Sequence, residues 1–224
     1  MPTIPDLRAY DAAAVRASVA VVAEVSTADL DRPTPCAAWD LRALLAHMTV
    51  QHHGFAAAAE GNGALLAVWQ PTASADPVGD YARAADRVLA AFAGDVLDRP
   101  FDLGEIGVTV PGRVAISFHF IDYVVHGWDV AATLGRPFHL PDDLVKAAVS
   151  VADRVPTGER RLLPGASFAP PLPEDDANGG DNGDNGGDNG GDSNGDNGGD
   201  NNGDNRDQFK HILRVLGRSP DFGK

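Results

Sequence analysis

The sequence has a single cysteine, Cys36, among its 224 residues. One cysteine excludes an internal disulfide framework and a zinc site built from several thiolates. No apolar run reaches the roughly 18 residues typical of a membrane-spanning helix. The first ten residues also lack the basic region and apolar core of a secretory signal peptide. These absences predict a cytoplasmic protein that has no membrane partner.

Basic residues are also few, because 18 Lys and Arg stand against 32 Asp and Glu, for a formal net charge of −14. The acidic excess is uneven, since residues 174–207 hold eleven acidic residues and one arginine. The rest of the chain therefore carries a net charge of only −4. The sequence has no basic patch of the kind that indicates nucleic-acid binding. The acidic segment also weakens attraction to nucleic acids and to anionic membranes, so we expect neither as a partner.

Aromatic residues are scarce at 7 %, whereas alanine, the strongest helix former, is abundant. Apolar positions recur at helical spacing in five segments that Gly- or Pro-containing stretches separate. The predicted helices span residues 5–26, 41–61, 78–96, 111–135 and 141–155, with short strands or irregular chain over 98–111. This pattern predicts an all-α fold, a four-helix bundle with one additional short helix.

The segment that follows the helices consists almost wholly of Asp, Asn and Gly. It cannot bury enough apolar surface to offset its ordering entropy, and it matches neither the EF-hand loop nor the RTX repeat. The sequence thus predicts three parts. These are a helical bundle over 1–173, a low-complexity, acidic, disordered insertion over 174–205, and a C-terminal segment, 206–224, that packs back on the bundle.

The predicted helix over 111–135 organises the bundle. One apolar line, expected to be its buried stripe, comprises Val114, Phe118, Ile121, Val125, Trp128 and Ala132. A neighbouring line holds His119, Asp122, His126 and Asp129 at spacings of three and four, so these side chains share one face. Asp122 and His126 have the spacing by which one helix offers two ligands to a divalent ion. The spacing equally fits a core histidine bonded to its neighbouring carboxylate, or a solvated polar edge.

Three stretches together resemble a known family: TPCAAWDLRALLAHM at 34–48, HFIDYVVHGWDVAATLGRP at 119–137 and LRVLGRSPDF at 213–222. They are similar to actinobacterial metal-binding proteins related to the N-terminal domain of mycothiol-dependent maleylpyruvate isomerase, in the DinB-like superfamily. The resemblance implies that residues 1–173 form a DinB-like bundle with a divalent metal near one end. It assigns His47, Asp122 and His126 as the metal ligands, and the isomerase has glutamate where this chain has Asp122.

Two imidazoles and one carboxylate suit zinc, and also nickel or iron(II). Three protein ligands leave a coordination position open, as in reactive rather than structural zinc sites. The resemblance implies a low-molecular-weight thiol such as mycothiol, activated by the metal for isomerisation of a small-molecule substrate or for S-transfer to it. The alternative is a metal-binding protein with hydrolytic activity or none, acting as a sensor or scaffold. We expect a monomer or a homodimer.

Three further residues are candidate neighbours of this centre, and the sequence assigns no catalytic residue. His119 is either a fourth ligand or a residue that lines a pocket or faces solvent. Asp129 lies one turn beyond His126 and either orients its imidazole or bonds a backbone group. Trp39 is expected to anchor packing near the metal end of the bundle, and His52 is expected at the surface.

Overall fold

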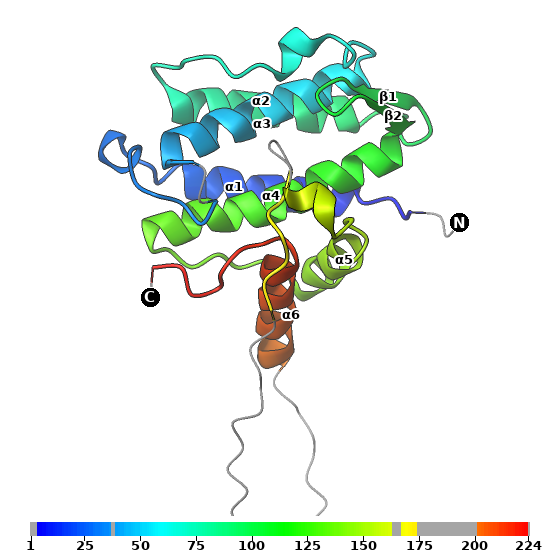
Figure 1. The fold of residues 1–224 in the computed structure, drawn as a ribbon. Coiled ribbons are helices and arrows are strands. Elements are labelled where there is room, and N and C mark those ends of the chain that lie inside the picture. The colour runs from blue at the N-terminus through cyan, green and yellow to red at the C-terminus, as the bar shows by residue number, and fades with distance from the viewer. Residues whose placement is uncertain (1–3, 37–38, 163–166, 174–200, 224) are drawn as a thin grey trace, which may run out of the picture.

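The computed structural model describes residues 4–36, 39–162, 167–173 and 201–223, and within these it confirms a mostly helical fold (Figure 1). In chain order the elements are α1 (Arg8–Val22), η1 (Thr27–Asp29), α2 (Leu41–Ala59), η2 (Leu66–Trp69), α3 (Pro77–Phe92), β1 (Pro100–Leu103), β2 (Val108–Pro111), α4 (Gly112–Leu134), α5 (Asp142–Ala152), η3 (Glu159–Leu162) and α6 (Asn201–Val215).

The α-helices lie in three pairs, α2 with α3, α1 with α4, and α5 with α6 (Figure 1). The α1/α4 pair lies between the other two, so α4 is the central helix of the molecule. The predicted start of α2 is confirmed, since Oδ1 of its N-cap Asp40 accepts a hydrogen bond from Ala43 N at 2.8 Å. The predicted end of α4 is also confirmed, because Gly135 adopts the left-handed φ of 67° that terminates a helix.

The predicted buried stripe of α4 is only partly right. Ile121 and Val125 are buried, but Val114, Trp128 and Ala132 are half-buried and Phe118 is 40 % exposed. The reason is that α4 contacts α1, α2, α5 and the two strands, so apolar residues are buried on most of its sides. A single-stripe pattern describes a helix at the surface of a bundle, not one at its centre.

The strands form an antiparallel hairpin in which Phe101 pairs with Val110. Strand β1 packs against α2 and α4 and buries Phe101 and Leu103, whereas most of β2 is exposed. The hairpin turn, residues 104–107, is held to the loop that follows α2 because Gly104 N donates to Gly63 O at 3.1 Å. The turn therefore has a fixed place beside α2.

Helix α6 begins at Asn201, five residues before the predicted start of the C-terminal segment. Extending an existing helix costs less than nucleating one, so a helix anchored by its apolar residues can continue into a polar segment. Residues 174–200 of the predicted insertion lie outside the described part of the chain. The apolar side of α6 is buried at Ile212, Leu213 and Leu216.

Gly217 ends this helix with a left-handed φ of 75°, and an added Cβ there would lie 2.7 Å from Cβ of Ala169. Arg218 N donates to Leu213 O at 2.8 Å, which closes the turn. The turn directs Arg218 back into the bundle, where its side chain is 3 % exposed.

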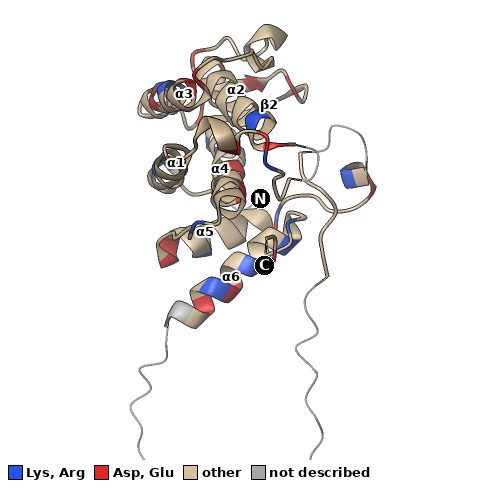
Figure 2. Ribbon diagram, turned by 90° about the vertical axis from the view of Figure 1, so that its left-hand side faces the viewer, with Lys and Arg blue, Asp and Glu red and all other residues tan. Residues whose placement is uncertain are grey.

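Charged residues of both signs lie along the outer helices (Figure 2), and some of them form local pairs of opposite sign. Arg83 pairs with Asp80 on α3, and Lys210 pairs with Asp207 on α6 at 3.4 Å. Exposed pairs of this kind contribute little to stability. Within the described ranges, no helix is both long and apolar enough to cross a bilayer.

Candidate metal centre

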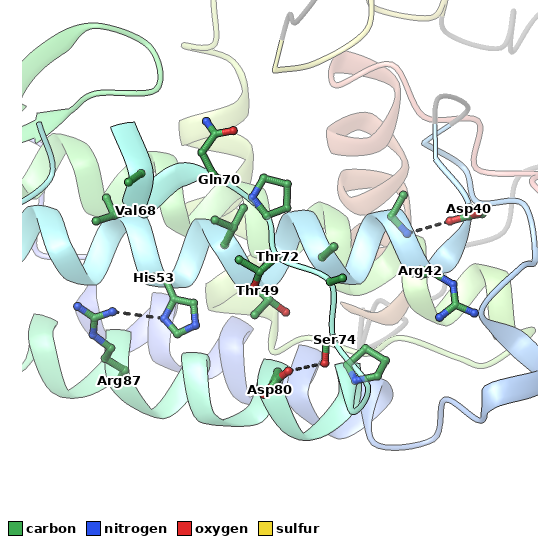
Figure 3. Close-up of a pocket in the computed structure, with 17 residues that line it drawn as sticks. Asp40, Arg42, Thr49, His53, Val68, Gln70, Thr72, Ser74, Asp80 and Arg87 are labelled. Atoms are coloured by element: carbon green, nitrogen blue, oxygen red, sulfur yellow. Dashed lines mark hydrogen bonds between the residues drawn. The ribbon is translucent and has the colours of Figure 1, made fainter. Parts of the chain in front are cut away.

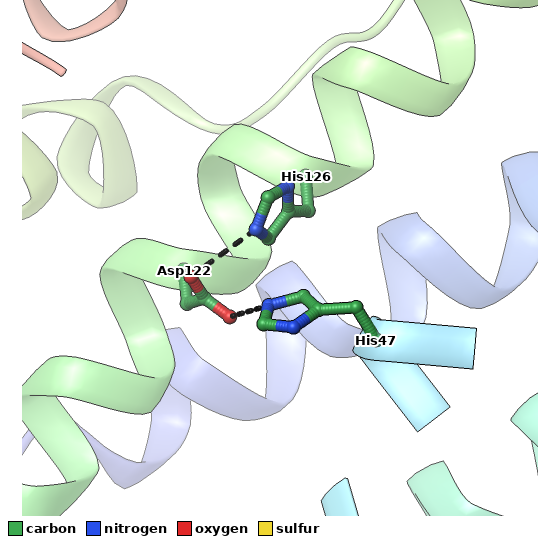
Figure 4. Close-up of side chains that lie close together, drawn as sticks. All are labelled: His47, Asp122 and His126. Carbon is green, nitrogen blue, oxygen red and sulfur yellow. Dashed lines mark ion pairs between the residues drawn. The ribbon is translucent and has the colours of Figure 1, made fainter. Parts of the chain in front are cut away.

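His47, Asp122 and His126 converge between α2 and α4 (Figure 4). One ligand atom from each residue lies within 4.8 Å of the others. Nε2 of His126 is 3.4 Å from Oδ1 of Asp122, and Nε2 of His47 is 3.9 Å from Oδ2 of the same carboxylate. Atoms that bind one ion at roughly 2 Å each stand roughly 3–4 Å apart. The two histidine–carboxylate distances have this spacing, so the three side chains are candidate ligands of a single divalent ion.

The antiparallel course of α2 and α4 brings these residues together. His47 on α2 faces His126 on α4, with ring centroids 5.2 Å apart. Further along α2, His52 faces His119, which lies earlier on α4, again at 5.2 Å. Helices α2 and α4 are thus antiparallel, and the candidate metal ligands lie at one end of the contact between them.

The centre is closed on one side and open on the other. The side chain of His126 is 2 % exposed, whereas those of Asp122 and His47 are 17 % and 23 % exposed. The exposed parts of the cluster are therefore on the side of His47 and Asp122, and His126 lies on the buried side.

Asp129 orients the buried histidine. Nδ1 of His126 donates to Oδ2 of Asp129 at 2.9 Å, because a carboxylate can only accept. The neutral imidazole then keeps its lone pair on Nε2, the nitrogen that faces Asp122. Nη2 of Arg218 lies 3.2 Å from the same Oδ2, so the carboxylate is paired on both sides. Of the two predicted roles of Asp129, the structure favours the orientation of His126.

Arg218 has a role that the sequence did not reveal. It belongs to the LGR of the closing segment at 213–222, one of the stretches that carry the family resemblance. Its place in that stretch was the sequence signal that could have identified Arg218 as a functional residue. Only the fold shows that this arginine reaches a carboxylate 89 residues earlier in the chain.

Trp39 packs on both imidazoles, with ring centroids 4.4 Å from His47 and 6.1 Å from His126. The loop before α2 fixes this position, because Oγ1 of Thr34 donates to Trp39 O at 2.9 Å. Trp39 therefore lies at the predicted end of the bundle and restricts the rotation of the His47 ring.

Burial and charge shift the pKa values of all three candidate ligands. Burial, aided by the charge of His126, lowers the pKa of His47 to about 4. Burial also opposes a charge on His126, but Asp122 and Asp129 outweigh it and raise the pKa of His126 to about 9. Burial works against the charge of Asp122 as well, yet His126 and His47 lower its pKa to about 2. At neutral pH His126 is therefore protonated on both ring nitrogens, whereas His47 is neutral and Asp122 is ionised. A divalent cation would displace the proton on Nε2 of His126.

His119 belongs to a different cluster and is fully buried, which contradicts a solvent-facing position. Its Nδ1 is 2.6 Å from Oδ1 of Asp11, and its Nε2 is 3.0 Å from Nδ1 of His52. The prediction of a surface position for His52 is also wrong, since its ring is buried and stacks on Tyr123 at 3.9 Å. Both ring nitrogens of His119 are thus engaged away from the metal candidates. Asp11 was missed, although it lies on the buried face of α1 four residues after Leu7.

A hollow of about 890 Å³ lies on another side of α2, bounded by η2, the segment before α3, and α3 itself (Figure 3). Its walls include Ala43, Val50 and His53, but none of the three candidate ligands. Nη1 of Arg87 lies 3.3 Å from Nδ1 of His53 at one end of this hollow. The hollow and the candidate metal centre are therefore separate features of the surface around α2.

The fold and this cluster define a DinB-like helical bundle with a candidate metal centre. The family described as Mycothiol maleylpyruvate isomerase N-terminal domain matches residues 12–131, more than half of the chain. The chain belongs to this family. Two uncharacterized proteins of Mycobacterium tuberculosis, from strains CDC 1551 and H37Rv, are each 29 % identical over 185 residues, which cover 77 % of this chain and 88 % of the relative. No solved structure matches the chain significantly.

Proposed function

We propose that His47, Asp122 and His126 bind one divalent metal ion, zinc in the first place, with nickel and iron(II) as alternatives. The observation that carries this proposal is the convergence of two imidazole Nε2 atoms on one partly exposed carboxylate. The donor set of two nitrogens and one oxygen fits these metals. Asp129 supports the fit, because it leaves Nε2 of His126 unprotonated when the ring is neutral.

We further propose that the protein is a thiol-dependent isomerase or S-transferase that acts on a small molecule. A divalent ion in this centre would lower the pKa of a bound thiol and favour its thiolate form. The chain's own residues would hold the centre in place, His126 through Asp129 and His47 through Trp39. Mycothiol, which the family's description names, is the thiol we propose.

The test compares the purified protein with His126→Ala and with His139→Ala, which removes an exposed histidine outside the centre. Each protein is given zinc, mycothiol and either maleylpyruvate or the electrophile 1-chloro-2,4-dinitrobenzene, and product formation is followed by absorbance. We expect turnover that needs both zinc and thiol, that His126→Ala abolishes and that His139→Ala retains.

Metal binding without any thiol-dependent turnover would contradict the enzymatic proposal and favour the hydrolytic or non-catalytic alternative. Hydrolysis of simple esters by the zinc-loaded protein would separate those two. The cytoplasmic location and the choice between monomer and homodimer stay predictions.

A further inference from the structure

The hollow beside α2 has a wall that is held at both ends. This wall is the segment that leads from η2 to α3, and Trp69 anchors its first end. The indole is buried, donates from Nε1 to Gly63 O at 2.8 Å, and lies against Gly54 of α2, where an added Cβ would be 2.2 Å from the ring. At the second end Oγ of Ser74 donates to the carboxylate of Asp80 on α3 (Figure 3). The hollow is therefore a fixed feature of the fold.

All four charged side chains that line the hollow are already engaged by partners within the chain. The pairs are Arg87 with Glu60, Arg42 with Asp31, Asp80 with Arg83, and Asp40 with the backbone N–H of Ala43. Two of the four are positive and two are negative, so their charges also cancel. An ionic ligand would lose water in the hollow without gaining an unpaired opposite charge, which costs free energy. The hollow therefore favours an uncharged ligand.

His53 offers this ligand a hydrogen-bond donor. Nη1 of Arg87 lies 3.3 Å from Nδ1 of His53, and because a guanidinium can only donate, Nδ1 accepts. Burial and the charge of Arg87 lower the pKa of His53, so at neutral pH the ring is uncharged and carries its proton on Nε2. This nitrogen faces away from Arg87, toward the rest of the hollow, and no group among the described residues accepts its hydrogen (Figure 3).

Thr49 offers a hydrogen-bond acceptor one helical turn before His53, and it lines the same hollow. Its Oγ1 donates to Leu45 O at 2.7 Å, which leaves the lone pairs of the hydroxyl oxygen available. The surface that α2 contributes around these two groups is otherwise aliphatic, at Ala43, Ala46 and Val50. A primary amide is uncharged, and it accepts and donates through two different atoms. It therefore suits two partners that are one turn apart.

We propose that this hollow is a second ligand site, which takes an uncharged aliphatic molecule that ends in an amide. The amide oxygen would accept from Nε2 of His53, the amide nitrogen would donate to Oγ1 of Thr49, and the alkyl chain would lie against Ala46. The volume of about 890 Å³ is in the usual range for small-molecule sites. The proposal goes beyond the proposed function and is independent of it, because no candidate metal ligand lines the hollow.

The test titrates octanamide, octanoate and octylammonium into the ¹⁵N-labelled full-length chain at pH 7.5 and follows its backbone amide signals by NMR. The three probes share one alkyl chain and differ in the charge of the polar end. Metal is removed first, so that octanoate cannot bind at the candidate metal centre. We expect octanamide to bind at least about fivefold more tightly than either ion, with shifts in residues 42–53 and 67–74.

Two substitutions test the two parts of the site, and each has a matched control. His53→Phe removes the N–H donor and should weaken octanamide binding about fivefold, the effect of one neutral hydrogen bond. His53→Gln keeps an N–H donor and should bind like the wild type, as should His139→Phe, which changes an exposed histidine outside the hollow. Ala46→Leu fills part of the hollow and should weaken binding, whereas Ala147→Leu at a half-buried position of α5 should not.

Octanoate or octylammonium binding as tightly as octanamide would overturn the inference. So would octanamide binding that neither His53→Phe nor Ala46→Leu weakens, or the absence of octanamide binding at millimolar concentration. The Ala46→Leu variant tests the location of the site even if His53→Phe does not fold. All these outcomes leave the proposed metal centre standing.

Discussion

Oδ2 of Asp129 lies 2.9 Å from Nδ1 of His126, three residues before it on α4, and both side chains are buried. A carboxylate behind a metal-binding imidazole fixes its tautomer and raises its basicity. In this protein the carboxylate is itself paired with Arg218, which comes from the far end of the chain. The C-terminal segment therefore takes part in shaping the candidate centre.

Replacing Asp129 by Asn should weaken zinc binding by about 10- to 100-fold, the usual effect of losing such a partner. The amide keeps the volume of the side chain but loses the charge that favours Nδ1–H on His126. Competition with a chromophoric chelator at pH 7.5 measures the affinity. Asp86→Asn on the exposed side of α3 is the control for loss of one charge, and equal affinities in the two variants would refute the role of Asp129.

Replacing Arg218 by Ala should lower the free energy of unfolding by about 3 kcal/mol, because Asp129 would be left buried beside only one partner. Urea denaturation of the zinc-free proteins measures this loss. The double variant Asp129→Asn/Arg218→Ala should lose less than the sum of the single variants, since their interaction is removed only once. Additive losses would show that the pair contributes nothing.

The metal-free protein should lose stability as the pH rises from 6.5 to 9. The pKa of His126 is raised to about 9, so its charged form favours the fold below pH 6.5, and this contribution disappears as the pH passes the raised value. The pKa of His47 is lowered to about 4, so its contribution is present above pH 6.5 and is lost as the pH falls toward 4. Urea denaturation of metal-free wild type and His126→Gln across pH 5–9 checks this, and the decline above pH 6.5 should be weaker in the variant.

Zinc binding should release about one proton per ion between pH 6.5 and 9, because His126 must lose its proton to bind. The apparent affinity should then rise about tenfold per pH unit in this range and level off above it. Calorimetry in buffers of different ionisation enthalpy counts the protons. An affinity that is independent of pH would mean that His126 is not a ligand.

The second buried cluster should be separable from the metal centre. Asp11→Asn removes the charge beside Nδ1 of His119 and should destabilise the protein by about 3 kcal/mol. The same variant should bind zinc with unchanged stoichiometry, because neither residue belongs to the candidate ligand set. A loss of zinc without a loss of stability would mean that the ligand set has been assigned wrongly.

The sequence predicted those features that depend on local signals. The ends of α4 follow from Pro111 and Gly135, and the start of α2 follows from its Asp40 cap. The ligand candidates were predictable because Asp122 and His126 share one helix face and the family resemblance added His47. Each of these inferences needs only residues close in the chain, or a motif in a known order.

The features that were missed depend on contacts between distant parts of the chain. The pairing of Arg218 with Asp129 requires the turn at Gly217, and the contact of His52 with His119 requires the crossing of α2 and α4. The burial of α4 depends on how many elements surround it. The spacing of apolar residues within one helix does not give that number. The hydrogen bond between Gln51 and Glu105 was missed for the same reason, since a hairpin turn brings them together across 54 residues.

The central claim is that His47, Asp122 and His126 form one metal site, and the most direct test is the zinc content of protein purified with zinc and then freed of loosely bound metal. The wild type and His139→Ala should each contain about one zinc per chain, while His126→Ala and His47→Ala should contain almost none. A wild type without zinc, nickel or iron, or a His126→Ala variant with as much metal as the wild type, would contradict the claim.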